Sequence, residues 1–384
     1  MNSNTQNKIS LLDLTKKLIG FKSISPEQAG GIDYLQQLLE QNSFNVTRLD
    51  RNDTSNLIAK IGTDGPTFAF AGHIDVVPTG DIKKWEFNPF ELTEHDGHLY
   101  GRGIADMKGS VAAFVIAAIN YLKNNELNNG QIAILLTSDE ESSAIDGTPV
   151  IVEYLKKTGQ KIDYCLLGEP TSVADLGDTI KVGRRGSLTG EIEVLGKQGH
   201  IAYPDLCINP IHMFAEALAE LTQIKWDNGN APFPATSFQF ANLNSGLGVS
   251  NVIPNSLIAN FNFRYNDLHT ADSLARKVEA ILDKHQVHYN IKWTNSAKPF
   301  RTKSGKLLDV IQSSIKENLS TTASLKTDGG TSDGRFLVDV CNELVEFGLS
   351  NKHIHQINER IKSSDLENLS KTYYSLLYKL FNNG

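Results

Sequence analysis

The chain has few cysteines, and their number and spacing exclude a disulfide framework. Among its 384 residues only Cys165, Cys207 and Cys341 are cysteine. An odd, widely spaced set with no Cys-x-x-Cys pair does not suit a network of disulfides. We therefore expect buried free thiols in a reducing compartment, the cytoplasm.

Long hydrophobic runs and an excess of positive charge are also missing. No uninterrupted apolar stretch approaches the roughly 18 residues of a membrane span, and the polar first residues lack the apolar core of a signal peptide. The chain has 37 Lys and Arg against 44 Asp and Glu, a formal net charge of -7. Because nucleic acids are bound by basic surfaces, we expect no nucleic acid among the partners. The missing apolar span likewise leads us to expect no membrane.

The patterns that are present predict an α/β protein with two domains. Strand-like and helical segments alternate in the N-terminal part, which predicts a three-layer domain with a mostly parallel sheet. Strands are expected there at 57–61, 67–71, 131–137 and 163–167, and helices at 8–18, 109–122 and 150–157.

The pattern changes after Gly183-Arg184-Arg185-Gly186. The next part suits a small α+β layer of one sheet and two helices, with strands at 187–194, 236–243, 251–265 and 287–293 and helices at 210–224 and 271–285. The α/β pattern then returns, with a helix at 307–318 and a strand at 343–347. The simplest organisation is a domain of residues 1–184 and 299–384 with a second domain, 185–298, inserted into it.

Five short segments each end in a carboxylate or an imidazole that suits a metal ion. They are Gly72-His73-Ile74-Asp75, Gly103-Ile104-Ala105-Asp106, Asp139-Glu140-Glu141, Gly168-Glu169-Pro170 and Ile354-His355. The first and the last three are preceded by apolar, strand-like runs. Because functional side chains gather beyond the carboxyl ends of parallel strands, we expect these loops to meet. Two histidines with several acids favour a divalent cation, above all zinc.

The spacing within two segments suggests how the work is divided. His73 and Asp75 are two residues apart and point the same way if the chain is extended, so Asp75 can hold the second ring nitrogen of His73. Adjacent side chains diverge, so one of Glu140 and Glu141 can bind metal while the other acts as a general base.

Taken alone, each segment also has an ordinary interpretation. Asp106 suits a helix cap, and Glu140 and Glu141 suit an acidic loop. In His353-Ile354-His355 only one imidazole need bind metal, and position alone leaves both open. The joint occurrence of five such segments is what favours a metal site.

Together the segments resemble the dinuclear zinc amidohydrolases of the M20 metallopeptidase family. The resemblance rests on Ala71-Gly72-His73-Ile74-Asp75-Val76-Val77-Pro78, Gly101-Arg102-Gly103, Asp106-Met107-Lys108-Gly109, Asp139-Glu140-Glu141 and Gly168-Glu169-Pro170. It extends over most of the chain through Gly183-Arg184-Arg185-Gly186-Ser187-Leu188, Gln198-Gly199-His200-Ile201-Ala202-Tyr203-Pro204, Gly329-Gly330-Thr331-Ser332-Asp333-Gly334-Arg335 and Ile354-His355-Gln356-Ile357-Asn358-Glu359.

The resemblance implies two zinc ions per subunit, which cobalt or manganese can replace. It implies that His73 and Glu169 hold one ion and that Glu141 and His355 hold the other. Asp106 is then the carboxylate that bridges the two ions.

The resemblance also implies three catalytic residues and a set of substrate contacts. Asp75 orients His73, Glu140 is the general base for the attacking water, and His200 reaches the active site of the partner subunit to stabilise the oxyanion. Arginine suits substrate carboxylates because its planar fork makes two hydrogen bonds. The expected substrate-binding residues are Arg184, Tyr203, Asn251, Arg264, Gly330 and Thr331.

The implied protein is a hydrolase that acts on a small molecule and forms a homodimer through the inserted domain, which serves as dimerisation and lid domain. Within the family the match is closer to enzymes that hydrolyse the amide of N-succinyl-LL-2,6-diaminopimelate to succinate and LL-2,6-diaminopimelate in lysine biosynthesis. The double arginine favours such a substrate with an extra carboxylate. Another M20 hydrolase, such as an acetylornithine deacetylase or an aminoacylase, is the nearest alternative, and a non-catalytic metal-binding protein is a remote one.

Overall fold

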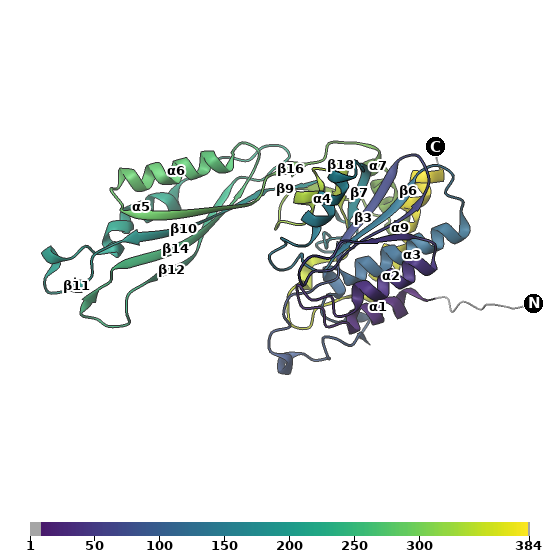
Figure 1. Ribbon diagram of the computed structural model, residues 1–384, viewed down its shortest axis with the longest axis horizontal. Coiled ribbons are helices and arrows are strands. Elements are labelled where there is room, and N and C mark those ends of the chain that lie inside the picture. Colours follow the sequence, from purple (N-terminus) through teal and green to yellow (C-terminus); the bar gives the residue numbers. More distant parts are fainter. Residues whose placement is uncertain (1–8, 383–384) are drawn as a thin grey trace, which may run out of the picture. The chain divides into compact units, whose positions relative to one another are not determined.

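The computed structural model describes residues 9–382, which fall into two compact units (Figure 1). The larger unit contains the described residues up to Gly183, together with Thr302–Lys326 and those from Ser332 onward. The smaller unit contains Arg184–Arg301 and Thr327–Thr331. The boundaries expected from the sequence put Arg184, residues 299–301 and residues 327–331 in the larger domain, whereas all of these lie in the smaller unit.

A mixed eight-stranded sheet forms the centre of the larger unit. Its strands are β1 Asn45–Arg48, β2 Asn56–Gly62, β3 Thr67–His73, β6 Gln131–Thr137, β7 Ile162–Leu167, β8 Thr179–Lys181, β17 Ser324–Lys326 and β18 Cys341–Glu346. Their order is β1-β2-β6-β3-β7-β18-β8-β17. The four central strands from β6 to β18 run parallel, while β2 is antiparallel to β1 and β6. The predicted mostly parallel sheet is confirmed.

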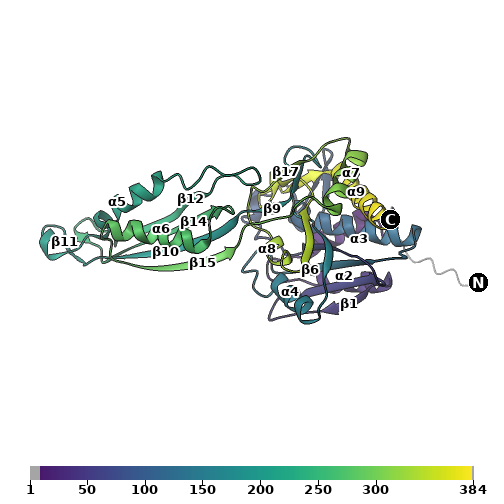
Figure 2. The same cartoon turned by 90° about the horizontal axis from the view of Figure 1, so that it is seen from above.

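Helices cover both faces of this sheet (Figure 2). One face is covered by α1 Leu11–Gly20, α2 Gly31–Gln41, α3 Gly109–Asn124, α7 Lys306–Leu319 and α9 Ser363–Asn382, whose apolar side chains share one core with the sheet. The opposite face carries α4 Thr148–Lys157 and the short α8 Gly334–Leu337, which contact each other. The three-layer α/β architecture is therefore confirmed.

The strand that carries the first metal segment lies deep in this core. All residues of β3 are buried, as expected for a central parallel strand. Phe70 of β3 stacks on Phe114 of α3 with ring centroids 4.3 Å apart, and Tyr373 of α9 meets both rings edge-on. Such close packing fixes the end of β3, where His73 is the last residue.

The helix segment Ile104–Asn124 is, within residues 9–382, long and apolar enough to cross a membrane by length and composition alone. Its apolar stretch is 94% buried inside the fold. It is therefore accounted for as the central core helix of the larger unit.

The smaller unit is a four-stranded antiparallel sheet with two helices packed on it. Its strands are β10 Gly186–Leu195, β12 Ser237–Ser245, β14 Ser256–Tyr265 and β15 Tyr289–Ala297, in the order β12-β14-β10-β15. The helices are α5 Pro210–Gln223 and α6 Ala271–Lys284. Burial alternates along β10 and β14, because one face of the sheet meets the helices.

One predicted strand of this unit is divided. The segment expected as a single strand at 251–265 forms β13 Val252–Ile253 and β14, with Pro254 between them. Proline has no backbone N–H to donate to a ladder, so the strand stops there. β13 pairs instead with β11 Gly199–His200.

Several short elements complete the chain. A small antiparallel sheet of the larger unit contains β4 Thr93–His95, β5 His98–Tyr100 and β19 Arg360–Lys362. β9 Gly183–Arg184 and β16 Phe300–Arg301 lie where the chain passes between the units. All three cysteines are free, but only Cys165 is buried; Cys207 and Cys341 are partly exposed, so their expected burial was wrong.

Candidate metal centre

Most of the predicted ligands stand where the parallel strands of the larger unit end. His73 closes β3, Glu140 and Glu141 follow β6, and Glu169 follows β7. Asp106 lies in the irregular helical turn η2, Ile104–Lys108, which leads into α3. These positions agree with the rule that open parallel sheets collect functional groups at the carboxyl ends of their strands.

His355 reaches the site by a less direct route than predicted. The sequence placed it directly beyond the strand at 343–347. After β18 the chain instead forms the short helix η4, Asn351–His353, before it reaches His355. Of the two histidines in this segment, His355 is the one that lies against the acids, with Nε2 2.9 Å from Oε1 of Glu141.

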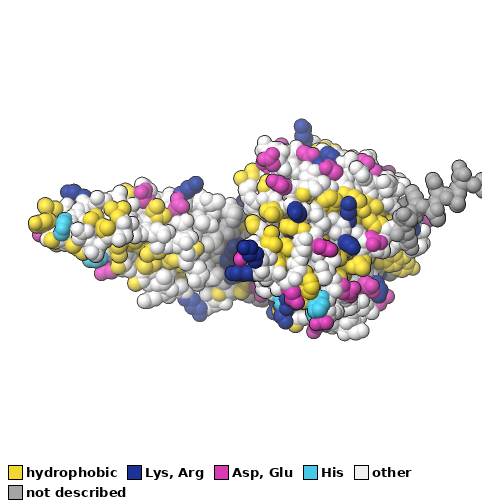
Figure 3. Space-filling view, turned by 90° about the horizontal axis from the view of Figure 1, so that it is seen from below, with side chains coloured by type: hydrophobic (Ala, Val, Ile, Leu, Met, Phe, Trp, Pro, Cys, Tyr) yellow, Lys and Arg dark blue, Asp and Glu magenta, His cyan; other side chains and the backbone are white. Residues whose placement is uncertain are grey.

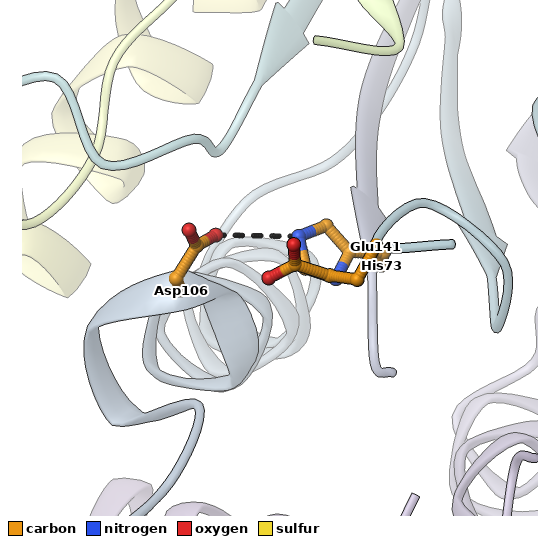
Figure 4. A group of neighbouring side chains, drawn as sticks. All are labelled: His73, Asp106 and Glu141. Carbon is orange, nitrogen blue, oxygen red and sulfur yellow. Dashed lines mark hydrogen bonds and ion pairs between the residues drawn. The ribbon is translucent and has the colours of Figure 1, made fainter. Parts of the chain in front are cut away.

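Asp106 lies between two imidazoles. Its Oδ1 is 3.3 Å from Nε2 of His73, and its Oδ2 is 3.3 Å from Nε2 of His355. The carboxylates of Asp106 and Glu141 both point toward the ring of His73 (Figure 4). A carboxylate whose two oxygens face two different imidazoles has the arrangement that a bridging ligand requires.

The possible ligand atoms form two groups that share His73. The atoms of His73, Asp106 and Glu141 all lie within 4.8 Å of one another, and so do those of His73, Glu140 and Glu169. Glu140, predicted as the general base, therefore lies close enough to be a ligand itself.

The charge of the cluster suits a cation. Burial raises the pKa of Glu169 well above its usual value, and the nearby Asp106 and Glu140 raise it further. Burial is also the main cause that raises the pKa of Glu140. Oε1 of Glu169 is buried with no hydrogen-bond partner among the described residues. A divalent cation would give this oxygen a partner and offset the negative charge, so the residues fit a metal.

The same acids stabilise the protonated, positively charged form of the two imidazoles. Burial would lower the pKa of His73, but Asp106 and Asp75 outweigh it and raise that pKa well above its usual value. Hydrogen bonds to Asp106 and Glu141 raise the pKa of His355 to about 10. Metal ligation requires neutral imidazoles, so an ion that binds here displaces protons.

Asp75 makes more contacts than the sequence suggested. Nδ1 of His73 lies 2.9 Å from the backbone oxygen of Asp75 and 3.5 Å from its Oδ1. The fully buried carboxylate also accepts the backbone N–H groups of Glu140 and Glu141, at 3.1 and 3.0 Å from Oδ2. One acid thus contacts both the ring of His73 and the loop that carries the two glutamates.

Two residues of the site were missed because the sequence gave them no role. Nη1 of Arg102 donates to Oε2 of Glu359 at 2.7 Å, and both side chains are almost completely buried. The same carboxylate accepts backbone N–H groups from the loop that ends at Asp106. Glu359 stands in a polar segment and reads as a solvated acid. Arg102 was the signal that could have revealed this pair, because an arginine between two glycines had no assigned partner.

Lys108 was also overlooked. Its side chain is fully buried, and Nζ donates to the carbonyl oxygen of Phe21 at 2.8 Å. Burial lowers the pKa of Lys108 to about 7, although Asp75 and Glu359 act to raise it. The lysine joins the loop of Asp106 to the residue that follows α1.

The predicted oxyanion residue and two predicted substrate residues are neighbours in the smaller unit. The rings of His200 and Tyr203 lie 5.7 Å apart, and the carbonyl of Asn251 accepts the N–H of Ile201. Nδ1 of His200 accepts the N–H of Ala202 at 3.1 Å. A neutral His200 therefore carries its proton on Nε2, and this is the nitrogen that can donate to a ligand.

The other predicted substrate residues also belong to the smaller unit. Nη1 of Arg184 lies 3.4 Å from the carbonyl oxygens of Asp328 and Gly330. Thr331 follows Gly330 directly. Arg264 lies on β14, where it pairs with Ser187 of β10.

Comparison with known proteins gives the family. The sequence profile of peptidase family M20/M25/M40 matches residues 69–379. The succinyl-diaminopimelate desuccinylase of Pseudoalteromonas atlantica is 47% identical over 370 residues, which are 96% of this chain and 98% of that protein. An M20 family metallo-carboxypeptidase of Sulfolobus solfataricus has a TM-score of 0.80 at 20% identity and covers 96% of this chain and 99% of its own. A dinuclear metal binding peptidase of the M20 family from Bacillus subtilis has a TM-score of 0.71 at 15% identity, with 97% and 98% covered.

The two distant structures share the fold, and the profile and the desuccinylase extend the match to the sequence over nearly the full length. The family resemblance predicted from the metal segments is confirmed. This chain belongs to peptidase family M20/M25/M40.

Proposed function

We propose that this protein hydrolyses the amide bond of N-succinyl-LL-2,6-diaminopimelate and releases succinate and LL-2,6-diaminopimelate, a step of lysine biosynthesis. The observation that carries the proposal is the 47% identity to a succinyl-diaminopimelate desuccinylase across nearly the whole of both chains. The convergent acids and histidines of the larger unit are its hydrolytic centre.

His73 and Glu169 would hold one metal ion, Glu141 and His355 would hold the other, and Asp106 would be the ligand common to both. Zinc suits this set of nitrogen and oxygen ligands, and cobalt or manganese can replace it. When bound, the ions supply Lewis acidity to the scissile carbonyl and the attacking water. The facing oxygens of Asp106 and the partnerless Oε1 of Glu169 support this assignment.

Glu140 is the general base. It takes a proton from the attacking water and passes it to the nitrogen of the scissile amide, so that this nitrogen departs as a neutral amine. Support comes from its place beside His73 and Glu169, since one possible ligand atom of each of the three residues lies within 4.8 Å of the other two. Asp75 keeps it there, because its carboxylate accepts the backbone N–H of Glu140.

His200 stabilises the negative oxygen of the tetrahedral intermediate from the partner subunit. Its exposed ring and its Nδ1 contact with Ala202 support this role, since they leave the Nε2–H to donate. The carboxylates of the substrate are bound by arginines and by short polar groups. The residues are Arg184, Arg264, Tyr203, Asn251, Gly330 and Thr331.

The protein forms a homodimer through the smaller unit and acts in the cytoplasm. Apolar side chains are spread along the face of this unit that Figure 3 shows. Independently of this view, the exposed apolar side chains of the smaller unit include Ile201 at 55%, Leu206 at 66%, Leu243 at 48% and Leu247 at 62%. β12 is also an edge strand of its sheet. Exposed apolar groups beside an open strand edge favour association with a second copy.

A steady-state assay of the zinc-loaded protein tests the activity. N-succinyl-LL-2,6-diaminopimelate and acetylornithine are compared at equal enzyme concentration, and the succinyl compound is expected to give the higher kcat/KM. The reverse order would assign an acetylornithine deacetylase or a related amidohydrolase. Tight zinc binding without hydrolysis of either compound or of simple acylated amino acids would leave a metal-binding protein.

A further inference from the structure

We propose that Glu359 is a positioning residue that joins the two halves of the metal centre. It acts on Asp106 through backbone amides and on His355 through the short segment that carries both residues. This inference rests on the proposed metal site and adds a residue whose carboxylate accepts hydrogen bonds from Arg102 and from backbone amides.

The first half of the proposal is the way Glu359 holds the loop of Asp106. Its Oε2 accepts the N–H of Gly103 at 3.0 Å, and its Oε1 accepts the N–H groups of Ala105 and Asp106 at 3.0 and 3.3 Å. Backbone amides that converge on one anion form a nest, which fixes the chain around it. Asp106 itself has non-helical dihedrals, φ -128° and ψ 95°, so no regular helix fixes its direction. The hydrogen bonds from these backbone amides to Glu359 fix the direction of Asp106 instead.

The second half concerns the segment of His355. This residue has φ 61° and Asn358 has φ 60°, in the left-handed region that costs free energy for residues other than glycine. The side chain of His355 is 47% exposed, so packing does little to hold it. The position of this segment therefore depends on contacts that its backbone and its neighbouring residues make with the rest of the larger unit.

The anchor lies at Glu359 and beside it. The backbone oxygen of Glu359 accepts the N–H of Gly101 at 3.1 Å, and the next residue begins β19, where Arg360 pairs with Tyr100 of β5. The Oδ1 of Asn358 accepts the N–H of Glu86 at 2.8 Å. The chain that carries His355 is thus tied to the chain that leads into Asp106.

Arg102 completes the arrangement. Its guanidinium donates to Glu359 at 2.7 Å and lies 5.1 Å from the ring centroid of Trp85. The carboxylate is therefore buried with its charge matched and both of its oxygens used. A glutamine at this position keeps the shape but places an NH2 group against either the guanidinium or a backbone N–H, where an acceptor is required.

Metal binding by Glu359→Gln tests the proposal. Metal-free protein is titrated with zinc and, separately, with cobalt, whose visible absorption reports the geometry of its ligands. We expect the dissociation constant of the weaker ion to rise by about 10- to 100-fold, as is typical when outer partners of metal ligands are removed. The cobalt spectrum should change, and kcat should fall more than KM rises.

Glu343→Gln is the matched control. Glu343 is also a glutamate that accepts two backbone amides, from Lys306 and Leu307 at 3.1 and 2.9 Å, but these amides begin α7 and do not belong to a loop that carries a proposed ligand. This variant should bind both ions as the wild type does. Glu359→Asp keeps the charge opposite Arg102 and shortens the reach, so a smaller loss of affinity is expected; it serves if the glutamine variant does not fold.

The outcomes separate this inference from the proposed function. A folded Glu359 variant with wild-type metal affinities and an unchanged cobalt spectrum would overturn the positioning role, as would an equal loss of affinity in the control. A wild type that binds no metal overturns the role and the metal centre together. A wild type that binds two ions but does not hydrolyse the succinyl substrate refutes the proposed activity alone. The comparison of metal affinity between the wild type and the Glu359 variants then still tests the positioning role.

Discussion

Glu140 and Glu141 are adjacent, yet the proposed mechanism gives them different tasks, and glutamine substitutions separate these tasks. Glu140→Gln keeps the shape of the side chain and removes the base. Glu141→Gln weakens a ligand whose Oε1 lies 2.9 Å from Nε2 of His355. The first variant should lose turnover and keep its metal, whereas the second should lose metal.

The size of the first effect follows from the role. A positioned general base contributes about 10²- to 10⁴-fold to a rate, which corresponds to about 3–5 kcal/mol of transition-state stabilisation. The loop itself should stay in place, because Asp75 holds the backbone N–H groups of both glutamates rather than their side chains. We therefore expect kcat to fall by about 10²- to 10⁴-fold with little change in KM.

The measurement combines kinetics with metal content. Both variants are loaded with zinc, dialysed against the same metal-free buffer, and assayed for bound zinc and for hydrolysis of N-succinyl-LL-2,6-diaminopimelate. Glu140→Gln should retain two ions per subunit. Glu141→Gln should retain fewer, and added zinc should restore part of its activity.

A specific result would refute this division. Since one possible ligand atom each of Glu140, His73 and Glu169 lies within 4.8 Å of the other two, Glu140 is also placed to be a ligand. If Glu140→Gln loses an ion as Glu141→Gln does, Glu140 is a ligand and the base must be another residue. Turnover within tenfold of the wild type would equally exclude Glu140 as the base.

Three further predictions concern stability. Tyr373→Phe removes a hydroxyl that donates to the carbonyl of Phe347 at 2.7 Å, and urea denaturation should show a loss of about 1–3 kcal/mol; Tyr378→Phe, at a side chain that is 44% exposed, should show almost none. Burial acts to raise the pKa of Asp227, but hydrogen bonds from backbone and side-chain donors outweigh it and lower that pKa. The ionised carboxylate therefore stabilises the smaller unit above about pH 4, and this effect is lost as the pH falls through the lowered pKa. The difference in free energy of unfolding between wild type and Asp227→Asn should consequently become smaller on acidification. A difference that stays constant with pH would contradict the assignment. A chelator should abolish hydrolysis and lower Tm, because ions that bind only the folded state stabilise it, and zinc or cobalt should restore both.

The sequence predicted the central strands and the ligand loops because their signals are local. The apolar run at 131–137 coincides with β6, and the acid pair that follows it therefore lies beyond the carboxyl end of a parallel strand, where functional groups collect. His73 at the end of β3 follows the same logic. Parallel strands buried on both faces leave continuous apolar runs, which a single sequence reveals well.

Besides the four-residue α8, the helices α2 and α9 were missed, because the local signals of these two helices are weak. α2 begins at Gly31 after Gly30, which has no capping side chain, so the usual start signal is absent. Oε1 of Gln28 instead accepts the N–H groups of Ile32 and Asp33 at 3.0 and 3.4 Å. α9 begins directly after β19, so no loop separates the two elements. In both helices tertiary packing of the buried stripe determines the structure more than intrinsic propensity does.

The remaining omissions are long-range. Glu359 meets Gly103 and Asp106 across more than two hundred residues of chain, and no local pattern reports such a contact. The inclusion of Thr327–Thr331 in the smaller unit is of the same kind. Burial of an acid can be inferred from sequence only when its partner is known, and here the partner Arg102 was itself unassigned.

The route of the chain through the metal centre sets an order for biosynthesis. The ribosome makes about 5–20 residues per second, and domains fold as units once their residues are available. β18 lies between β7 and β8, which are made earlier, and the segment that carries His355 and Glu359 follows β18 in the chain. Nascent chains that already display His73, Asp106 and Glu141 therefore lack the segment that completes the site. We therefore expect a nascent chain that stops before His355 to bind metal more weakly than a chain in which the proposed ligands from β3 to His355 have all been made.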